Sequence, residues 1–169
     1  MPMDPNELIA RLNECGIAYE LFEHPAVLTV DEMMATCGDI GGTHTKNLFL
    51  RDGKKAHYLV TLRHDARIDL KALRSVLGAR GGLSFASTEA LREHLGVESG
   101  AVSPFAAMNS APGAVKIFVQ DRLLLEEHID VHPLSNNLTL KIKPEDMMAA
   151  LRADVRSLEI FALPDSDEV

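Results

Sequence analysis

The chain has 169 residues and a formal net charge of −8, with 46% hydrophobic and 25% charged residues. This length and composition are those of one ordinary globular domain with a sizeable core, and they exclude a disordered protein. The acidic charge argues against a protein that holds long nucleic acid by bulk electrostatics. Because there is also no helix-turn-helix or basic arm, we expect no binding to DNA.

The basic residues are concentrated in one segment of the chain. Between Lys46 and Arg80 there are nine Lys and Arg residues against three Asp and Glu, a local charge of +6, whereas the rest of the chain carries −14. A small anionic ligand site on an otherwise repelling surface needs such segregation, although a solvated basic face produces the same pattern.

Targeting signals and paired cysteines are both missing from the sequence. No apolar run approaches the ~20 residues of a membrane span, and the N-terminus lacks the basic and apolar regions of a signal peptide, so we expect a cytoplasmic protein without membrane contact. The two cysteines, Cys15 and Cys37, are far apart without a CxxC motif. They indicate neither a disulfide framework nor a thiolate metal site, and we expect both thiols to be buried or half-buried.

The predicted elements begin with a helix over residues 5–16, because Asp4 is a suitable N-cap and Pro5 stands at the first helical position. Residues 17–24 alternate between apolar and polar side chains and predict a strand. A capping box and a terminal glycine predict a second, short helix over residues 29–38.

A β-hairpin is predicted next, with strands over 46–50 and 57–62 joined by a turn at 51–54 that contains Asp-Gly. The second strand, "YLVTL", is apolar enough to be central in a sheet. The remaining predicted elements are a helix over 68–78, a short strand over 81–86, a helix over 87–96, strands over 114–120 and 137–142, a helix over 143–153, a strand over 157–163 and a disordered acidic tail over 164–169.

Strands and helices intermingle in this order without strict βαβ alternation. We therefore expect an α+β (mixed α/β) fold in a single domain over residues 1–163.

Several common catalytic signatures are absent. His128 and His132 are four residues apart, but the Ile- and Val-rich stretch before Pro133 favours a strand or loop, in which the two would lie roughly 13 Å apart. No third ligand is evident, so a metal site is not indicated. The sequence has no GxSxG motif, Cys15 falls inside a helix, and "GDIGG" lacks the spacing of a phosphate-binding loop.

Two loops carry the remaining candidate residues. In "GGTHTKN", Gly41 and Gly42 allow close approach to the backbone, and Lys46 presents a cation at the start of a strand. The second loop, residues 96–110, is too long for a tight turn and too apolar for a solvated loop, which is typical of pocket-forming segments. Taken singly, each loop is better explained as an ordinary connection.

Taken together, the motifs resemble a known family. Lys46 with "NLFLRD", then "YLVTL", "GAVSPF", "VKIFVQD" and "HPLSNNLTLKI" are similar, in this order, to the free-standing prolyl-tRNA synthetase-associated editing domains, over residues 5–162. Within that family the chain most resembles the branch that removes alanine from mischarged tRNA(Pro), rather than the branch that removes cysteine. The resemblance implies the editing-domain fold, in which helices flank a central, mixed, largely antiparallel curved sheet.

The resemblance also implies an activity, a trans-acting aminoacyl-tRNA deacylase that hydrolyses the ester of mischarged Ala-tRNA(Pro). A pocket sized for proline cannot strongly reject alanine, because a methylene or so is worth only ~1 to 3 kcal/mol, and a second site that excludes proline by size restores the discrimination. The family implies direct attack by water, without a metal, cofactor or covalent intermediate.

The site residues implied by the resemblance centre on Lys46, at the mouth of the editing pocket. Backbone N–H groups of the loop around Gly100 to Pro104 would stabilise the oxyanion. His132 would form a wall of the pocket, position the water or serve as a structural hydrogen bonder. The catalytic set is Lys46, Gly100, Ser103 and His132, and the substrate-binding set is Thr45, Asn47, Ala101, Val102, Pro104, Arg51, Lys54 and Lys55.

The implied partner is the acceptor end of tRNA(Pro), with prolyl-tRNA synthetase as a further candidate. Arg51, Lys54 and Lys55 at the hairpin tip are placed to contact phosphates. Two alternatives remain open. One is a deacylase for cysteine or serine on the same site, and the other is a non-catalytic module that binds tRNA 3′ ends or a synthetase.

Overall fold

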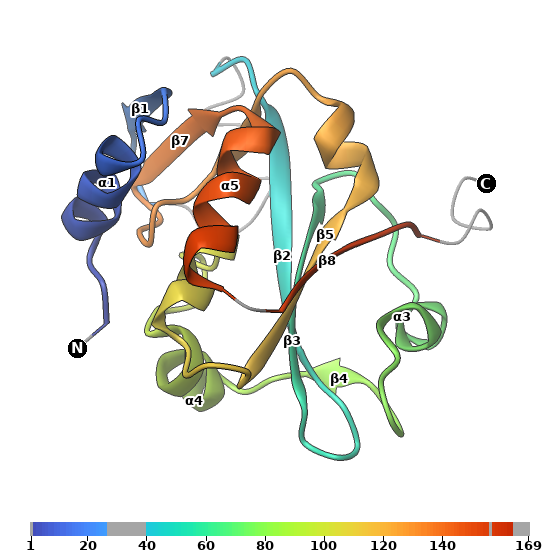
Figure 1. Ribbon diagram of the computed structural model, residues 1–169. Helices are drawn as coiled ribbons and strands as arrows, with labels where there is room; N and C mark the ends of the chain where they lie inside the picture. The colour runs from blue at the N-terminus through green and yellow to red at the C-terminus, as the bar shows by residue number, and fades with distance from the viewer. Residues whose placement is uncertain (1, 27–39, 156, 164–169) are drawn as a thin grey trace.

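The structure is a computed structural model that describes residues 2–26, 40–155 and 157–163 (Figure 1). Within these residues, eight strands form one mixed sheet in the order β1-β7-β6-β2-β3-β5-β8, with β4 paired to β2 off this path. The strands are β1 (Tyr19–Glu23), β2 (Thr43–Arg51), β3 (His57–Arg63), β4 (Ser84–Phe85), β5 (Val115–Gln120), β6 (Ile129–Val131), β7 (Leu138–Ile142) and β8 (Leu158–Phe161).

The sheet combines local antiparallel pairs with parallel pairs that join distant parts of the chain. Antiparallel pairs are β1–β7, β6–β7, β2–β3 and β2–β4, whereas β2–β6, β3–β5 and β5–β8 are parallel. The expected mixed sheet with flanking helices is confirmed. The parallel pair between β2 and β6 is short, Thr43 with Ile129 and His44 with Asp130, so the two strands separate just before Lys46.

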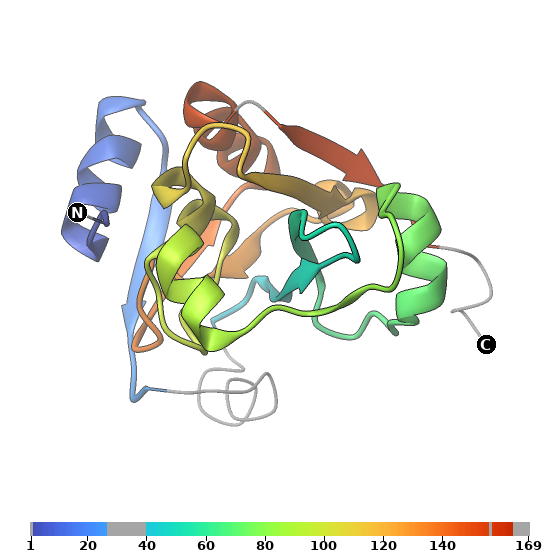
Figure 2. The ribbon, with the colours of Figure 1, turned by 90° about the horizontal axis from the view of Figure 1, so that it is seen from below.

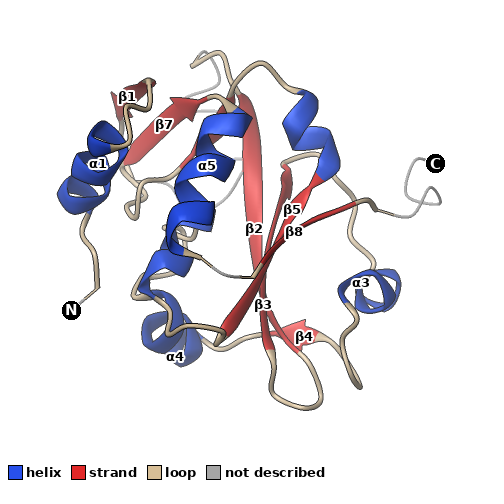
Figure 3. Ribbon diagram, viewed as in Figure 1, coloured by secondary structure: helices blue, strands red, loops and turns tan. Residues whose placement is uncertain are grey.

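The helices begin where their caps predict (Figure 3). In α1 (Pro5–Glu14) the N-cap Asp4 accepts a hydrogen bond from the Glu7 N–H, and α3 (Leu70–Leu77) is capped in the same way by Asp69. The short α4 (Thr88–Ala90) continues as a π-helical turn at Leu91–Leu95, and α5 (Pro144–Asp154) begins at its proline. Two 3-10 helices, Pro104–Asn109 and Asp121–Leu125, had no counterpart among the predicted elements.

Two apolar clusters flank the sheet. The larger one joins α1, α5 and the Pro104–Asn109 turn to the sheet, and the smaller one packs Leu73 and Leu77 of α3 against Leu50, Tyr58 and Val60 of the hairpin. Seen from below, the segment that carries β4 runs from α3 to α4 past the tip of the β2–β3 hairpin (Figure 2).

Some expectations fall outside the structure, and one is wrong. The predicted second helix at 29–38, Cys37 and the tail at 164–169 lie outside the described residues. Cys15, expected to be buried or half-buried, is exposed. Cys15 is the C-cap of α1 and follows its last helical residue, Glu14, so it lies past the turns that bury Leu8 and Leu12.

Candidate active site

Lys46 lies on β2 just past the point where β2 and β6 separate. Its ammonium group is partly buried and donates a hydrogen bond to the carbonyl oxygen of Ala66. Burial lowers the pKa of Lys46, and the nearby Asp65 carboxylate opposes this shift. A partly buried cation that donates to a neutral carbonyl can exchange that partner for a more negative one, such as an ester oxygen or a phosphate.

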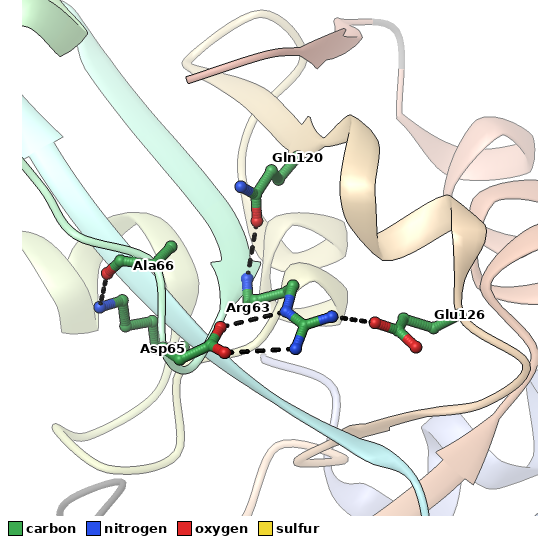
Figure 4. Close-up of polar contacts among 6 residues, drawn as sticks. Arg63, Asp65, Ala66, Gln120 and Glu126 are labelled. Atoms are coloured by element: carbon green, nitrogen blue, oxygen red, sulfur yellow. Dashed lines mark hydrogen bonds and ion pairs between the residues drawn. The ribbon is translucent and has the colours of Figure 1, made fainter. Parts of the chain in front are cut away.

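Arg63 braces the turn that supplies the Ala66 carbonyl (Figure 4). Its Nε and Nη2 atoms donate to the two carboxylate oxygens of Asp65, at 3.0 and 3.2 Å, and Nη1 pairs with Glu126. The Arg63 backbone N–H donates to the buried Gln120 side chain at 2.9 Å. These contacts fix the residues next to Ala66 and therefore the carbonyl that holds Lys46.

Asn47 connects β2 to the loop at residues 100–104. Its Nδ2 donates to the Val102 carbonyl at 3.0 Å, and its Oδ1 accepts from the buried Thr61 hydroxyl at 2.6 Å. Since both ends of the amide are engaged, Asn47 fixes the 100–104 loop against β2. The neighbouring Thr45 hydroxyl donates to the Asp130 carbonyl at 2.8 Å, which ties β2 to β6.

The loop itself offers a limited set of backbone donors. Gly100 has φ 93°, a left-handed conformation that favours glycine. The Ala101 N–H already donates to the Glu98 carbonyl, and Pro104 has no N–H. Within the described residues, the Val102 and Ser103 N–H groups have no backbone acceptor, and the buried Ser103 hydroxyl has no hydrogen-bond partner. Donors for an oxyanion are therefore available at Val102 and Ser103.

His132 follows β6 and is held by the adjoining strand. Its Nδ1 lies 2.7 Å from the Leu138 carbonyl oxygen, so Nδ1 carries the proton and donates, and Nε2 remains an acceptor. Burial lowers the pKa of His132, an effect opposed by the hydrogen bond to Leu138 and reinforced by His24. A neutral imidazole with a free lone pair can orient a water molecule.

The sequence did not point to a buried His44–Asp130 contact. His44 Nδ1 lies 3.3 Å from Asp130 Oδ2, with both side chains at most 5% exposed, and in the described part of the chain neither Asp130 oxygen has a hydrogen-bond donor. A Cβ at Gly42 would lie 2.1 Å from Asp130 Oδ1, so glycine is required there by this carboxylate. Two features of the sequence could have indicated this contact. His44 is on the same strand face as Lys46, and Asp130 lies between His128 and His132.

The structure separates the expected residues into two groups. Thr45 and Asn47 flank Lys46 on β2, and Asn47 contacts the loop at Val102. Arg51 instead lies five residues further along β2, about 17 Å away at ~3.3 Å per residue, and Lys54 and Lys55 follow in the hairpin turn. These three cations are therefore at the opposite end of the strand from Lys46.

The described residues contain neither a candidate metal cluster nor a helix that could span a membrane. Among them, no cluster of three or more His, Cys, Asp or Glu side chains has a geometry that could hold a metal ion. No helix in this part of the chain is long and apolar enough to cross a membrane.

A mixed sheet whose strand β2 carries a partly buried lysine and holds a loop with backbone donors fits the class of domains that edit aminoacyl-tRNA, and comparison with known families agrees. Residues 24–150, well over half of the chain, match the model of the aminoacyl-tRNA editing domain. The chain therefore belongs to the aminoacyl-tRNA editing domain family, and the expected enzyme class, an aminoacyl-tRNA hydrolase, is confirmed at that level.

Similar proteins narrow the relationship. The prolyl-tRNA editing protein ProX of Acetoanaerobium sticklandii is 36% identical over 165 residues, covering 96% of this chain and 100% of that protein. The prolyl-tRNA synthetase associated domain-containing protein 1 of Mus musculus is 41% identical over 152 residues, covering 87% and 89%. The expected resemblance to prolyl-tRNA synthetase-associated editing domains is thus confirmed.

Solved structures support the same fold. The crystal structure of a candidate trans-editing enzyme for prolyl tRNA synthetase aligns with a TM-score of 0.67, covering 97% of this chain and 100% of that chain. At 20% sequence identity this likeness concerns the fold alone.

Proposed function

We propose that the chain is a trans-editing deacylase that hydrolyses the ester of mischarged Ala-tRNA(Pro). One observation carries the proposal, namely that the partly buried Lys46 is followed directly on β2 by Asn47, which holds the 100–104 loop through Val102. We infer that the ester carbonyl is bound where both Lys46 and the loop N–H groups reach it, because a cation and backbone N–H groups are the two kinds of donor that it needs as it becomes an oxyanion. The relationship to ProX supports the choice of prolyl-tRNA as the substrate class.

In the proposed reaction, a water oxygen adds to the ester carbonyl carbon of the alanyl group. The carbonyl oxygen becomes an oxyanion that Lys46 and the N–H groups of Val102 and Ser103 stabilise. The bond to the ribose oxygen then breaks, that oxygen takes up a proton, and free alanine and tRNA(Pro) are released. His132 Nε2 and the substrate's own ribose hydroxyl or amine orient the attacking water, and the proton that the water loses passes to the departing ribose oxygen, so no side-chain general base is required.

The proposal extends to the substrate, the domain and its setting. Arg51, Lys54 and Lys55 at the hairpin tip contact acceptor-stem phosphates, where solvent-exposed cations bind without burying charge. Residues 1–163 form the editing domain, which works in the cytoplasm on tRNA(Pro) released by prolyl-tRNA synthetase. Proline is excluded by the size of the pocket, since alanine is smaller.

The test is single-turnover deacylation of tRNA(Pro) charged with alanine, cysteine, serine or proline. We expect fast release of alanine and slow release of proline, with a ratio of about 10²-fold or more, because steric exclusion is stronger than the loss of a single methylene contact. Preferential release of cysteine or serine would move the specificity to another small residue. Release of none of the four, with tRNA binding retained, would leave a non-catalytic tRNA-binding module.

A further inference from the structure

A cavity lies at the end of β2 opposite Lys46, between the hairpin tip and the start of α4. It encloses about 360 Å³ and is lined by Arg51, Lys55, His57, Phe85, Ser87 and Ala90. Because Arg51 is about 17 Å along the strand from Lys46, this cavity is separate from the site where the ester is cleaved.

An exposed aromatic ring forms one wall of the cavity. Phe85 is 63% exposed on the two-residue strand β4, where it pairs with Leu50. On the other wall, the His57 ring stacks on Phe49 with centroids 5.3 Å apart and packs against His94 at 4.4 Å. One ring is therefore open to a planar ligand, and the other is held in place by its neighbours.

Two cations stand at the rim of the cavity on a rigid turn. Arg51 and Lys55 are exposed, and Asp52 between them is buried. The Asp52 carboxylate accepts hydrogen bonds from the Lys54 and Ala56 N–H groups at 2.9 Å, which fixes the turn. An open aromatic ring with cations beside it is the combination that binds a nucleotide, with the base stacked and the phosphate neutralised.

We propose that this cavity binds a nucleotide of the tRNA acceptor end upstream of the 3′-terminal adenosine. Its base stacks on Phe85, and its phosphate is held by Arg51 and Lys55. The inference rests on the proposed function, because it takes the terminal adenosine to be at Lys46. The two sites are about 17 Å apart along β2, so a nucleotide bound here lies upstream of the terminal adenosine and not next to it. At the hairpin tip, where the proposed function gave only phosphate contacts, the cavity thus adds a contact to a base.

Phe85→Ala tests the base contact with two readouts. We expect it to weaken binding of an uncharged acceptor-stem minihelix of tRNA(Pro) about tenfold, as for the loss of one stacked base. We expect Phe85→Tyr to bind as the wild type does. In the second readout, Phe85→Ala should raise KM for Ala-tRNA(Pro) by a similar factor and leave hydrolysis of 3′-O-alanyl-adenosine unchanged, because that minimal substrate has no upstream nucleotide.

Arg51→Gln tests the phosphate contact, because each phosphate neutralised in a single strand contributes about 0.7 to the slope of log affinity against log salt. We expect Arg51→Gln to reduce the slope by about that amount and Phe85→Ala to leave it unchanged. Leu125→Ala is the matched control for removing an exposed apolar side chain, since Leu125 is 86% exposed on a different element, and it should bind normally.

Wild-type minihelix affinity in Phe85→Ala would overturn the inference, as would an equal loss of hydrolysis on the minimal substrate. Failure of the proposed function would give a different result, in which the wild type binds the minihelix but hydrolyses neither substrate. The two failures can be told apart because binding of the minihelix needs no turnover.

Discussion

Asp130 shows how a single buried carboxyl group affects the stability of the whole chain. Burial raises its pKa to about 6, against the opposing effect of Lys141. Since an unfolded Asp titrates near 3.9, the folded chain binds this proton more tightly. The contribution of Asp130 to stability is therefore fully present below about pH 4 and is lost as the pH rises through about 6.

Asp130→Asn should remove this loss without changing the shape of the side chain. At pH 8 we expect the variant to unfold about 4–8 °C above the wild type, corresponding to about 2 kcal/mol, and the gain should shrink as the pH is lowered toward 4. Thermal unfolding followed by circular dichroism at both pH values measures the difference. A lower melting temperature in the variant at pH 8 would mean that the carboxylate has a charged partner in the native state.

At the same scale, the sequence singled out Lys46 but not the residues that set its environment. A lysine between a glycine-rich loop and an apolar strand is visible as a pattern. The Arg63–Asp65 pair and the Ala66 carbonyl are not, because they become neighbours of Lys46 only when β3 pairs with β2. Asn47 was predicted among the substrate-binding residues, and its role in holding Val102 depends on a contact 55 residues away along the chain.

At the scale of the elements, the β2–β3 hairpin depends on one buried carboxylate. Burial of Asp52 opposes its ionisation, but hydrogen bonds from the Arg80, Ala56 and Lys54 N–H groups and the Tyr58 hydroxyl outweigh burial and lower its pKa to about 2. Asp52 therefore stabilises the fold above the unfolded pKa of about 3.9, and this contribution is lost as the pH falls through about 2.

Asp52→Asn should destabilise the hairpin tip, because the amide removes the charge and turns an NH2 group toward N–H donors. We expect a loss of about 2 kcal/mol at pH 7, seen as a melting temperature about 4–8 °C lower. Asp69→Asn is the matched control, since Asp69 caps α3 through one hydrogen bond to Lys71 and asparagine caps equally well. Equal melting temperatures for the two variants would contradict the role given to Asp52.

The elements that the sequence predicted well are those with local signals. Asp4, Asp69 and Ser87 marked helix starts, and the Asp-Gly turn marked the hairpin, because caps and turns are made by residues close in the chain. The 3-10 helix at Pro104–Asn109 was read as a loop. Its buried residues, including Phe105 and Ala106, are packed by the tertiary fold, so the local sequence did not reveal it.

At the scale of the whole molecule, the sequence predicted the fold class and the family motifs but not the pairing of the strands. The parallel pairs β2–β6 and β3–β5 join segments far apart in the chain, and no local pattern specifies them. They determine the site, because β2 and β6 meet only at Thr43 and His44 and then separate beside Lys46. The expected sheet and site residues came from the resemblance to a known family, because the periodicity of the residues did not specify them.

The account depends most directly on Lys46. The measurement is single-turnover deacylation of Ala-tRNA(Pro) by wild type, Lys46→Ala and Lys71→Ala, with tRNA binding and melting temperature measured in parallel. We expect Lys46→Ala to remain folded and to lose about 10²-fold or more in rate, as when an oxyanion donor is removed, and Lys71→Ala, an exposed lysine on α3, to match the wild type. A Lys46→Ala rate within about threefold of wild type would contradict the account.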